Sequence, residues 1–150
     1  MLSMVFRNST SDKTHSSKFF ENVLNIVTKE LKIKDSFSVS VNLVGEKKIQ
    51  ELNKKYHHKN KPTDVLSFPI GGKYVICNTK YLIRDFGDIF ICLSIAKNEA
   101  KRENISINNK LAQLTVHGFL HLMGYDHEIS EADANEMFKL EERILDKIKF

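Results

Sequence analysis

Apolar and polar residues follow two different periods along the chain, and these periods predict its helices and strands. In residues 18–31 the apolar positions fall three or four apart, as on one face of a helix, and residues 46–56 repeat this pattern more briefly. Residues 36–44 alternate strictly, which predicts a strand with one buried face. The apolar runs 65–70 and 88–94 are typical of strands, with a hairpin or loop over 71–87 between them. Pro69 favours a strand end or a sheet edge.

The second half of the chain predicts three helices. Residues 95–104 form a polar helix, whereas residues 109–123 are apolar almost all round and predict a buried helix. The last helix is expected to begin at Ser130, with Asp133 three residues later as in a capping box. The pattern shows no repeat, low-complexity segment or linker. We therefore expect one α+β domain over residues 1–150, in which a small mixed β-sheet packs with about five helices.

Composition narrows the class of protein. The 150 residues are 41% hydrophobic and 28% charged, as in a globular domain with a hydrophobic core. No apolar run reaches the roughly 20 residues that cross a bilayer, and the first residues lack the apolar segment of a signal peptide. We expect a cytoplasmic protein with no membrane partner.

The net charge of +4 is distributed unevenly. Residues 47–84 carry nine Lys or Arg against two acids, and residues 126–146 carry eight acids against two basic residues. A basic middle indicates a surface that attracts polyanions. A lysine-rich chain whose charges merely solvate its helices explains the same counts, so charge alone does not identify a partner.

Three of the six histidines lie in the sequence HGFLHLMGYDH, residues 117–127. His117 and His121 are four apart, which puts both on one face of the predicted buried helix. Gly124 is the residue type that ends helices in a left-handed turn, after which His127 can return to the same centre. Three neutral imidazoles that converge in this way form a zinc site at the end of the buried helix, with a fourth position open to water. Left uncoordinated, each would need a separate partner.

The same spacing occurs in the metzincin proteases, H-E-x-x-H-x-x-G-x-x-H. Every position matches except the glutamate, which is Gly118 here. That glutamate is the general base of peptide hydrolysis, and glycine cannot carry a proton. The motif therefore predicts a catalytic metal without the protease base, and a zinc peptidase is disfavoured.

The segments KPTDVLSFP, GDI and HGFLHLMGYDH, in this order, resemble the YbeY family of bacterial endoribonucleases (rRNA maturation factors), over essentially the whole chain. The resemblance implies a zinc-dependent, single-strand-specific endoribonuclease that acts in small-subunit (16S) rRNA 3′-end maturation and ribosome quality control. It implies one Zn²⁺ ion held by His117, His121 and His127. It also implies an rRNA precursor and the ribosomal small subunit as partners, with no DNA.

One position departs from the family. Before the PTDVLSFP segment the family usually carries an arginine, thought to matter for activity, and this chain has His57 there. An arginine can clamp a phosphate through two hydrogen bonds, whereas a histidine is only partly charged near neutral pH. His57 is our candidate catalytic residue, as an acid or a cation. The alternative is an exposed loop residue without a role.

Other candidates surround these motifs. Asp64 and Asp126 are candidates for orienting a metal-binding histidine, although Asp64 can equally cap a turn together with Thr63. A further group can guide an RNA backbone electrostatically or simply solvate a helix: Lys54, Lys55, Lys59 and Lys61.

The route of cleavage stays open at this level, because no general base is evident: either water or the RNA's own 2′-hydroxyl attacks the phosphate. The leading alternative in another class is an RNA-binding ribosome-assembly factor whose zinc is structural and which cleaves little.

Overall fold

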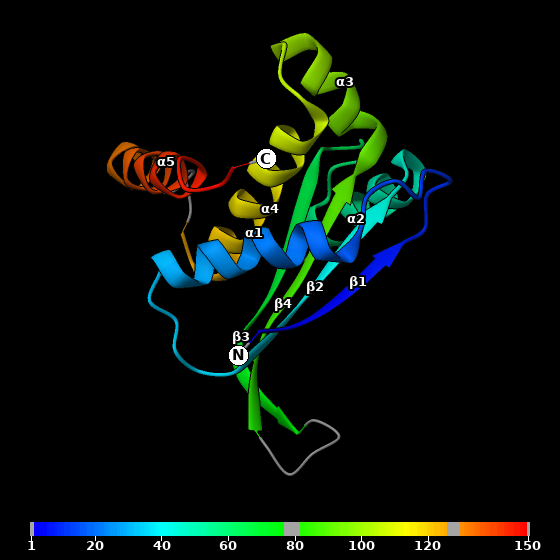
Figure 1. The fold of residues 1–150 in the computed structure, drawn as a ribbon. Coiled ribbons are helices and arrows are strands. Elements are labelled where there is room, and N and C mark those ends of the chain that lie inside the picture. The colour runs from blue at the N-terminus through cyan, green and yellow to red at the C-terminus, as the bar shows by residue number, and fades with distance from the viewer. Residues whose placement is uncertain (1, 77–81, 126–129, 150) are drawn as a thin grey trace.

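The computed structural model describes residues 2–76, 82–125 and 130–149, built on a four-stranded sheet in the order β1-β2-β4-β3 (Figure 1). The strands are β1 (Leu2–Asn8), β2 (Phe37–Val44), β3 (Val65–Ile76) and β4 (Leu82–Cys92). β1 and β4 both run parallel to β2, whereas β3 pairs antiparallel with β4. The sheet is therefore mixed, which confirms the predicted α+β class.

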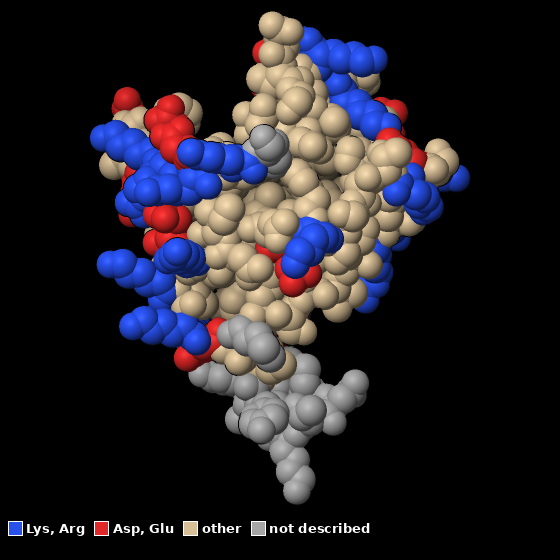
Figure 2. All heavy atoms as spheres, viewed as in Figure 1, with Lys and Arg blue, Asp and Glu red and all other residues tan. Residues whose placement is uncertain are grey.

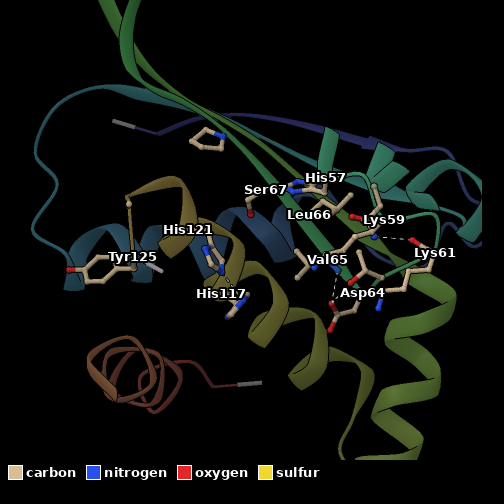
Figure 3. Close-up of a pocket in the computed structure, with 14 residues that line it drawn as sticks. His57, Lys59, Lys61, Asp64, Val65, Leu66, Ser67, His117, His121 and Tyr125 are labelled. Carbon is tan, nitrogen blue, oxygen red and sulfur yellow. Dashed lines mark hydrogen bonds between the residues drawn. The ribbon is translucent and has the colours of Figure 1, made fainter. Parts of the chain in front are cut away.

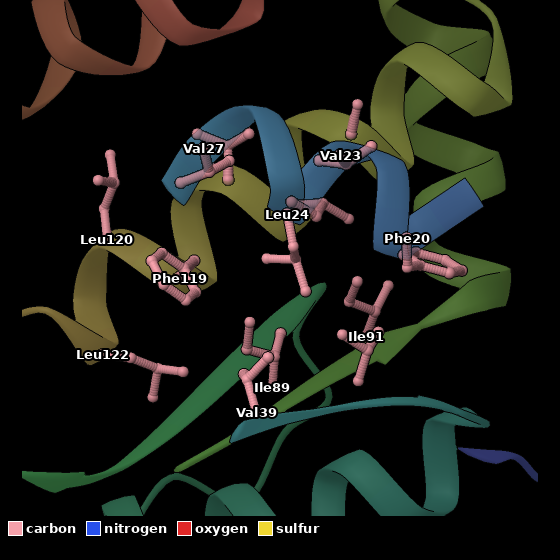
Figure 4. Close-up of a cluster of buried hydrophobic side chains, with 14 of the residues drawn as sticks. Phe20, Val23, Leu24, Val27, Val39, Ile89, Ile91, Phe119, Leu120 and Leu122 are labelled. Atoms are coloured by element: carbon pink, nitrogen blue, oxygen red, sulfur yellow. The ribbon is translucent and has the colours of Figure 1, made fainter. Parts of the chain in front are cut away.

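Five helices accompany the sheet in the part of the chain that the structure describes. They are α1 (Ser17–Glu30), α2 (Glu46–His57), α3 (Leu93–Glu103), α4 (Ile107–Leu122) and α5 (Glu131–Leu145). α1 and α4 pack on one face of the sheet, and α2 covers the other face with a smaller apolar cluster (Figures 1 and 4). Within the described ranges, no helix is long and apolar enough to cross a membrane.

The main core lies between α1, α4 and the sheet. The apolar face predicted for the first helix is buried as expected, and Figure 4 shows it against side chains of β2, β4 and α4. Its buried apolar members are Phe20, Val23, Leu24 and Val27. Each such side chain contributes about 1.5–3 kcal/mol on burial. This packing fixes α4, the helix of the histidine motif, in place against the sheet.

β1 was not predicted, and β2 is more deeply buried than its alternating pattern indicates. In β1 the alternating residues Leu2, Met4 and Phe6 are only partly buried against the core, because β1 is an edge strand, and its pattern is correspondingly weak. In β2 the predicted exposed polar face is largely buried, because β2 lies between two strands. Its polar groups are satisfied internally: the Asn42 side chain donates to Ser40 Oγ and to the Ile89 carbonyl.

Residues 71–87, predicted as a hairpin or loop, belong in their described part to the antiparallel pair β3 and β4, and both strands are longer than expected. β3 continues through Pro69 to Ile76, and β4 begins at Leu82 rather than 88. β4 ends at Cys92 because α3 starts there. The predicted edge position of Pro69 is confirmed, because β3 has one neighbour. Opposite Pro69, Gly87 adopts φ +118°, and a Cβ there would lie 2.1 Å from the Phe68 carbonyl oxygen.

Candidate metal centre and its cleft

α4 carries His117 and His121 on one face of its last turns. The helix begins at Ser106, whose side chain accepts a hydrogen bond from the Asn109 amide. It ends in the left-handed turn predicted at Gly124, which has φ +96°. The amides of Gly124 and Tyr125 donate to the carbonyls of His121 and Leu120, so the turn is closed as in a Schellman motif. The chain direction after His121 is thereby fixed.

The two histidine rings meet edge-on, with an angle of 74° between their planes. Their Nε2 atoms are 3.1 Å apart, and the ring centroids are 4.6 Å apart (Figure 3). Two nitrogen ligands of one tetrahedral zinc, each at about 2.0–2.1 Å, lie roughly 3.3 Å apart. The separation of 3.1 Å is that of a hydrogen bond between the two nitrogens, and it is also close to the spacing of two ligands of one metal ion. The third predicted ligand, His127, and the candidate Asp126 lie outside the described residues.

Glu141 on α5 holds the other side of the His117 ring. Its Oε1 atom is 2.5 Å from His117 Nδ1, and both side chains are half-buried. A carboxylate on Nδ1 holds that nitrogen as the donor, so Nε2 is the nitrogen that can act as a metal ligand, as is common for histidine ligands. Nothing in the sequence distinguishes Glu141 from the other acids of residues 126–146, because only the packing of α5 on α4 brings it to the histidine. The start of α5 is as predicted, since Ser130 Oγ accepts from the Asp133 amide.

Both histidines line a cleft of about 680 Å³. Its opposite wall comes from the end of α2, the segment after it and the start of β3 (Figure 3). The candidates His57, Lys59, Lys61 and Asp64 all line this cleft. Lys54 and Lys55 are exposed on α2, outside the described residues that line it. Segments separated by about sixty positions in the sequence thus meet at one site.

The basic segment after α2 is held by side chains of that helix. Asn53 is buried, and its side-chain amide donates to the Lys61 carbonyl at 2.9 Å, while its own carbonyl accepts from the Lys59 amide at 3.3 Å. Gln50 donates to Asn60 Oδ1 at 3.1 Å. His58 ends the helix in the left-handed conformation, with φ +59°. The lysines are therefore presented from a fixed backbone.

Asp64 caps the start of β3. Its Oδ1 atom accepts from the Val65 amide at 2.7 Å and from the Thr63 hydroxyl at 3.4 Å. Behind it lies Glu99 of α3, and both residues line a second, smaller cavity. Burial, and then the neighbouring Asp64 carboxyl, raise the pKa of Glu99. Lys110 opposes this shift from 3.6 Å.

Gly118 stands where the metzincin motif has its glutamate, and the packing of α4 on the sheet requires a glycine at this position. A Cβ at this position would lie 2.9 Å from Ile89 Cγ2 and 3.1 Å from Ser67 Oγ. The Ser67 hydroxyl also donates to the Gly118 carbonyl at 2.9 Å. A glutamate therefore does not fit between α4 and the sheet, and the metzincin base has no room here.

The surface outside the cleft does not concentrate one sign of charge on the face seen in Figure 1. There, Lys and Arg are interspersed with Asp and Glu among uncharged side chains (Figure 2). Long-range attraction of a polyanion is therefore not expected from that face. The ordered lysines of the cleft are the better candidates.

Together, the fold and the site define a class of protein: an α+β domain with a pair of histidines in a cleft lined by lysines. The family model described as Endoribonuclease YbeY matches residues 4–149, so the chain belongs to the YbeY endoribonuclease family. The predicted resemblance is thereby confirmed.

Individual relatives agree with this assignment. The chain is 36% identical to Endoribonuclease YbeY of Persephonella marina, over 97% of this chain and 92% of that protein. It is 42% identical to Endoribonuclease YbeY of Staphylococcus carnosus, over 84% and 82%. The solution structure of TM1509 from Thermotoga maritima matches with a TM-score of 0.63 and 29% identity, over 96% of this chain and 87% of that one.

Proposed function

We propose that this protein is a zinc-dependent endoribonuclease specific for single-stranded RNA. It acts in the cytoplasm on the rRNA precursor of the ribosomal small subunit, in 16S rRNA 3′-end maturation and ribosome quality control. The observation that carries the proposal is the pair of facing Nε2 atoms of His117 and His121, 3.1 Å apart in a lysine-lined cleft. The relatives named as endoribonucleases support RNA cleavage as the chemistry of that cleft.

The metal would be one Zn²⁺ ion held by His117, His121 and His127. The spacing of the two described Nε2 atoms fits such an ion, and Glu141 orients the His117 ring toward it. When bound, zinc supplies Lewis acidity and a coordination position open to a small oxygen ligand. The histidines are neutral ligands, so the site keeps its positive charge for an anionic substrate.

The remaining residues act on the RNA backbone. Lys59 and Lys61 neutralise phosphates inside the cleft, and Lys54 and Lys55 extend this positive charge along α2. His57, at the cleft wall, donates a hydrogen bond to a phosphate oxygen or a proton to the leaving oxygen. Asp64 keeps the start of β3, and with it this wall, in position through its bond to the Val65 amide.

The test is cleavage of an end-labelled single-stranded rRNA fragment by zinc-loaded protein. The same fragment annealed to its complement, and a chelator followed by zinc re-addition, are the controls. We expect cleavage of the single strand alone, lost with chelator and restored by zinc. RNA binding without cleavage by zinc-containing protein would overturn the nuclease proposal in favour of an RNA-binding assembly factor. The product ends identify the attacking group, because only the 2′-hydroxyl route forms a 2′,3′-cyclic phosphate.

A further inference from the structure

Tyr56 is a large aromatic side chain that the fold leaves in solvent beside the cleft. It is the second-last residue of α2, and 54% of it is exposed. The next residue, His57, lines the cleft. Single exposed apolar residues are common on protein surfaces, so exposure alone implies no function. The Tyr56 ring is distinguished by the other aromatic rings that pack beneath it.

The Tyr56 ring rests on a ladder of aromatic rings. It makes an edge-to-face contact with Phe68 of β3, with the ring centroids 5.1 Å apart. Phe68 in turn packs on Phe90 of β4 at 5.6 Å, and the His57 ring lies 5.8 Å from Phe68. Phe68 and Phe90 both pack against the buried cluster under α2. The Tyr56 ring is therefore held in place by the sheet, which lowers the entropy lost when a ligand stacks on it.

One lysine lies directly at this ring. Lys55 Nζ lies over the Tyr56 ring, 5.2 Å from its centroid, in a cation–π contact. Lys54 and Lys59 are exposed close by in sequence, and Lys59 also lines the cleft. A rigid aromatic ring among lysines is the arrangement by which proteins hold single-stranded nucleic acid, with a base on the ring and its phosphates on the cations.

We infer that Tyr56 forms a base-stacking subsite for one unpaired nucleotide next to the cleavage cleft. Lys55 binds the phosphate of that nucleotide. A base inside a duplex is already stacked on both faces and cannot reach the ring, so the subsite selects single strands. The inference rests on the proposed function only in taking RNA as the ligand. It adds the contact that distinguishes paired from unpaired substrate.

The chain contains no tryptophan, and this permits a direct optical test. Tyr56→Trp introduces the only tryptophan, whose fluorescence is quenched when a base stacks on it. With the metal removed by chelator to prevent cleavage, we expect saturable quenching by a short single-stranded RNA. A strand of the same length with abasic sites, and the same RNA as a duplex, should leave the fluorescence largely unchanged. Phe138→Trp is the matched control, since Phe138 is 59% exposed on α5 and is not among the described residues that line the cleft.

Binding measurements complete the test. By anisotropy, Tyr56→Ala should weaken binding of the single strand by about five- to hundredfold, and Tyr56→Phe should restore it. The affinity for the abasic strand should be the same in Tyr56→Ala and Tyr56→Phe, because that strand has no base to stack on the ring. Equal quenching of Phe138→Trp, or unchanged affinity in Tyr56→Ala, would overturn the subsite. Because these assays involve no cleavage, such a result is separate from a failure of the nuclease proposal.

Discussion

His117 Nδ1 and Glu141 Oε1 lie 2.5 Å apart, and this contact joins α4 to α5 at the candidate metal centre. The carboxylate fixes which ring nitrogen faces the cleft. It also makes the imidazole a better metal ligand, because a hydrogen bond from Nδ1 increases the basicity of Nε2. α5 therefore contributes to the candidate site, although both of the site's described histidines, His117 and His121, come from α4.

Replacing Glu141 tests this role. Glu141→Gln should lower the affinity for Zn²⁺ by about ten- to hundredfold, since that is the usual effect of removing a carboxylate behind a histidine ligand. Competition with a colorimetric chelator measures the change. Glu142→Gln, on the adjacent exposed side chain, is the control and should bind zinc as the unmodified protein does. Equal affinities in the two variants would show that Glu141 does not support the metal.

Gly118→Ala tests the close approach of α4 to the sheet. The added methyl would lie 2.9 Å from the buried Ile89 side chain, whose branched Cγ2 cannot easily move. Overpacking of this kind costs about 1–3 kcal/mol, and the better helix propensity of alanine recovers at most about 1 kcal/mol. Urea denaturation should show a lower free energy of unfolding. Gly45→Ala, where a Cβ meets open space, should change it by less than about 1 kcal/mol; a larger loss there than at Gly118 would contradict this explanation.

Glu99 predicts a pH dependence of stability. Its pKa in the folded protein is raised by burial and by Asp64, despite the opposing charge of Lys110. Between its ordinary value of 4.5 and the raised value, the folded state therefore binds more protons than the unfolded state, and stability falls as pH rises. The other charged neighbours, Glu103 and Arg102, remain in every variant.

Glu99→Gln removes this titration. The variant should gain stability relative to the unmodified protein as pH rises through that window, because no charge is then forced into the cavity beside Asp64. Thermal unfolding at a series of pH values measures the difference, with the exposed Glu136→Gln as the control. Parallel stability curves for Glu99→Gln and the unmodified protein would refute the raised pKa.

Lys61 predicts a salt dependence of RNA binding. Its side chain lines the cleft, while its backbone carbonyl is held by Asn53 and survives substitution. Lys61→Ala should weaken binding of all single strands similarly and reduce the slope of log K against log [salt] by about 0.7–1. Lys18→Ala, an exposed lysine of α1 that is not among the residues lining the cleft, should leave the slope unchanged. An unchanged slope in Lys61→Ala would remove this lysine from the RNA path.

Local pattern predicted the elements that pack in the core. The apolar stripe of α1, the buried α4 and its end at Gly124 all follow from periodicity and from the conformational freedom of glycine. The side-by-side placement of His117 and His121 follows from helical geometry alone. These features depend on residues close together in the sequence.

The features that were missed depend on tertiary contacts. Glu141 reaches His117 across 24 positions only because α5 packs on α4. Ser40 and Asn42 look exposed in an alternating strand, yet they are buried because β2 has a neighbour on each side. The need for glycine at 118, on α4, comes from Ile89 of β4 and Ser67 of β3. The residues that make these contacts lie too far apart in the sequence for a local pattern to reveal them.

The most direct measurement is the single-turnover cleavage rate of single-stranded RNA by His121→Ala, together with its zinc content. His58→Asn is the matched control, because His58 is exposed, outside the described cleft lining, and in a left-handed conformation that asparagine tolerates. We predict that His121→Ala loses stoichiometric zinc and at least about a hundredfold in rate, while the control keeps both. Full cleavage by His121→Ala would contradict the assignment of this cleft as a zinc-dependent RNA-cleaving site.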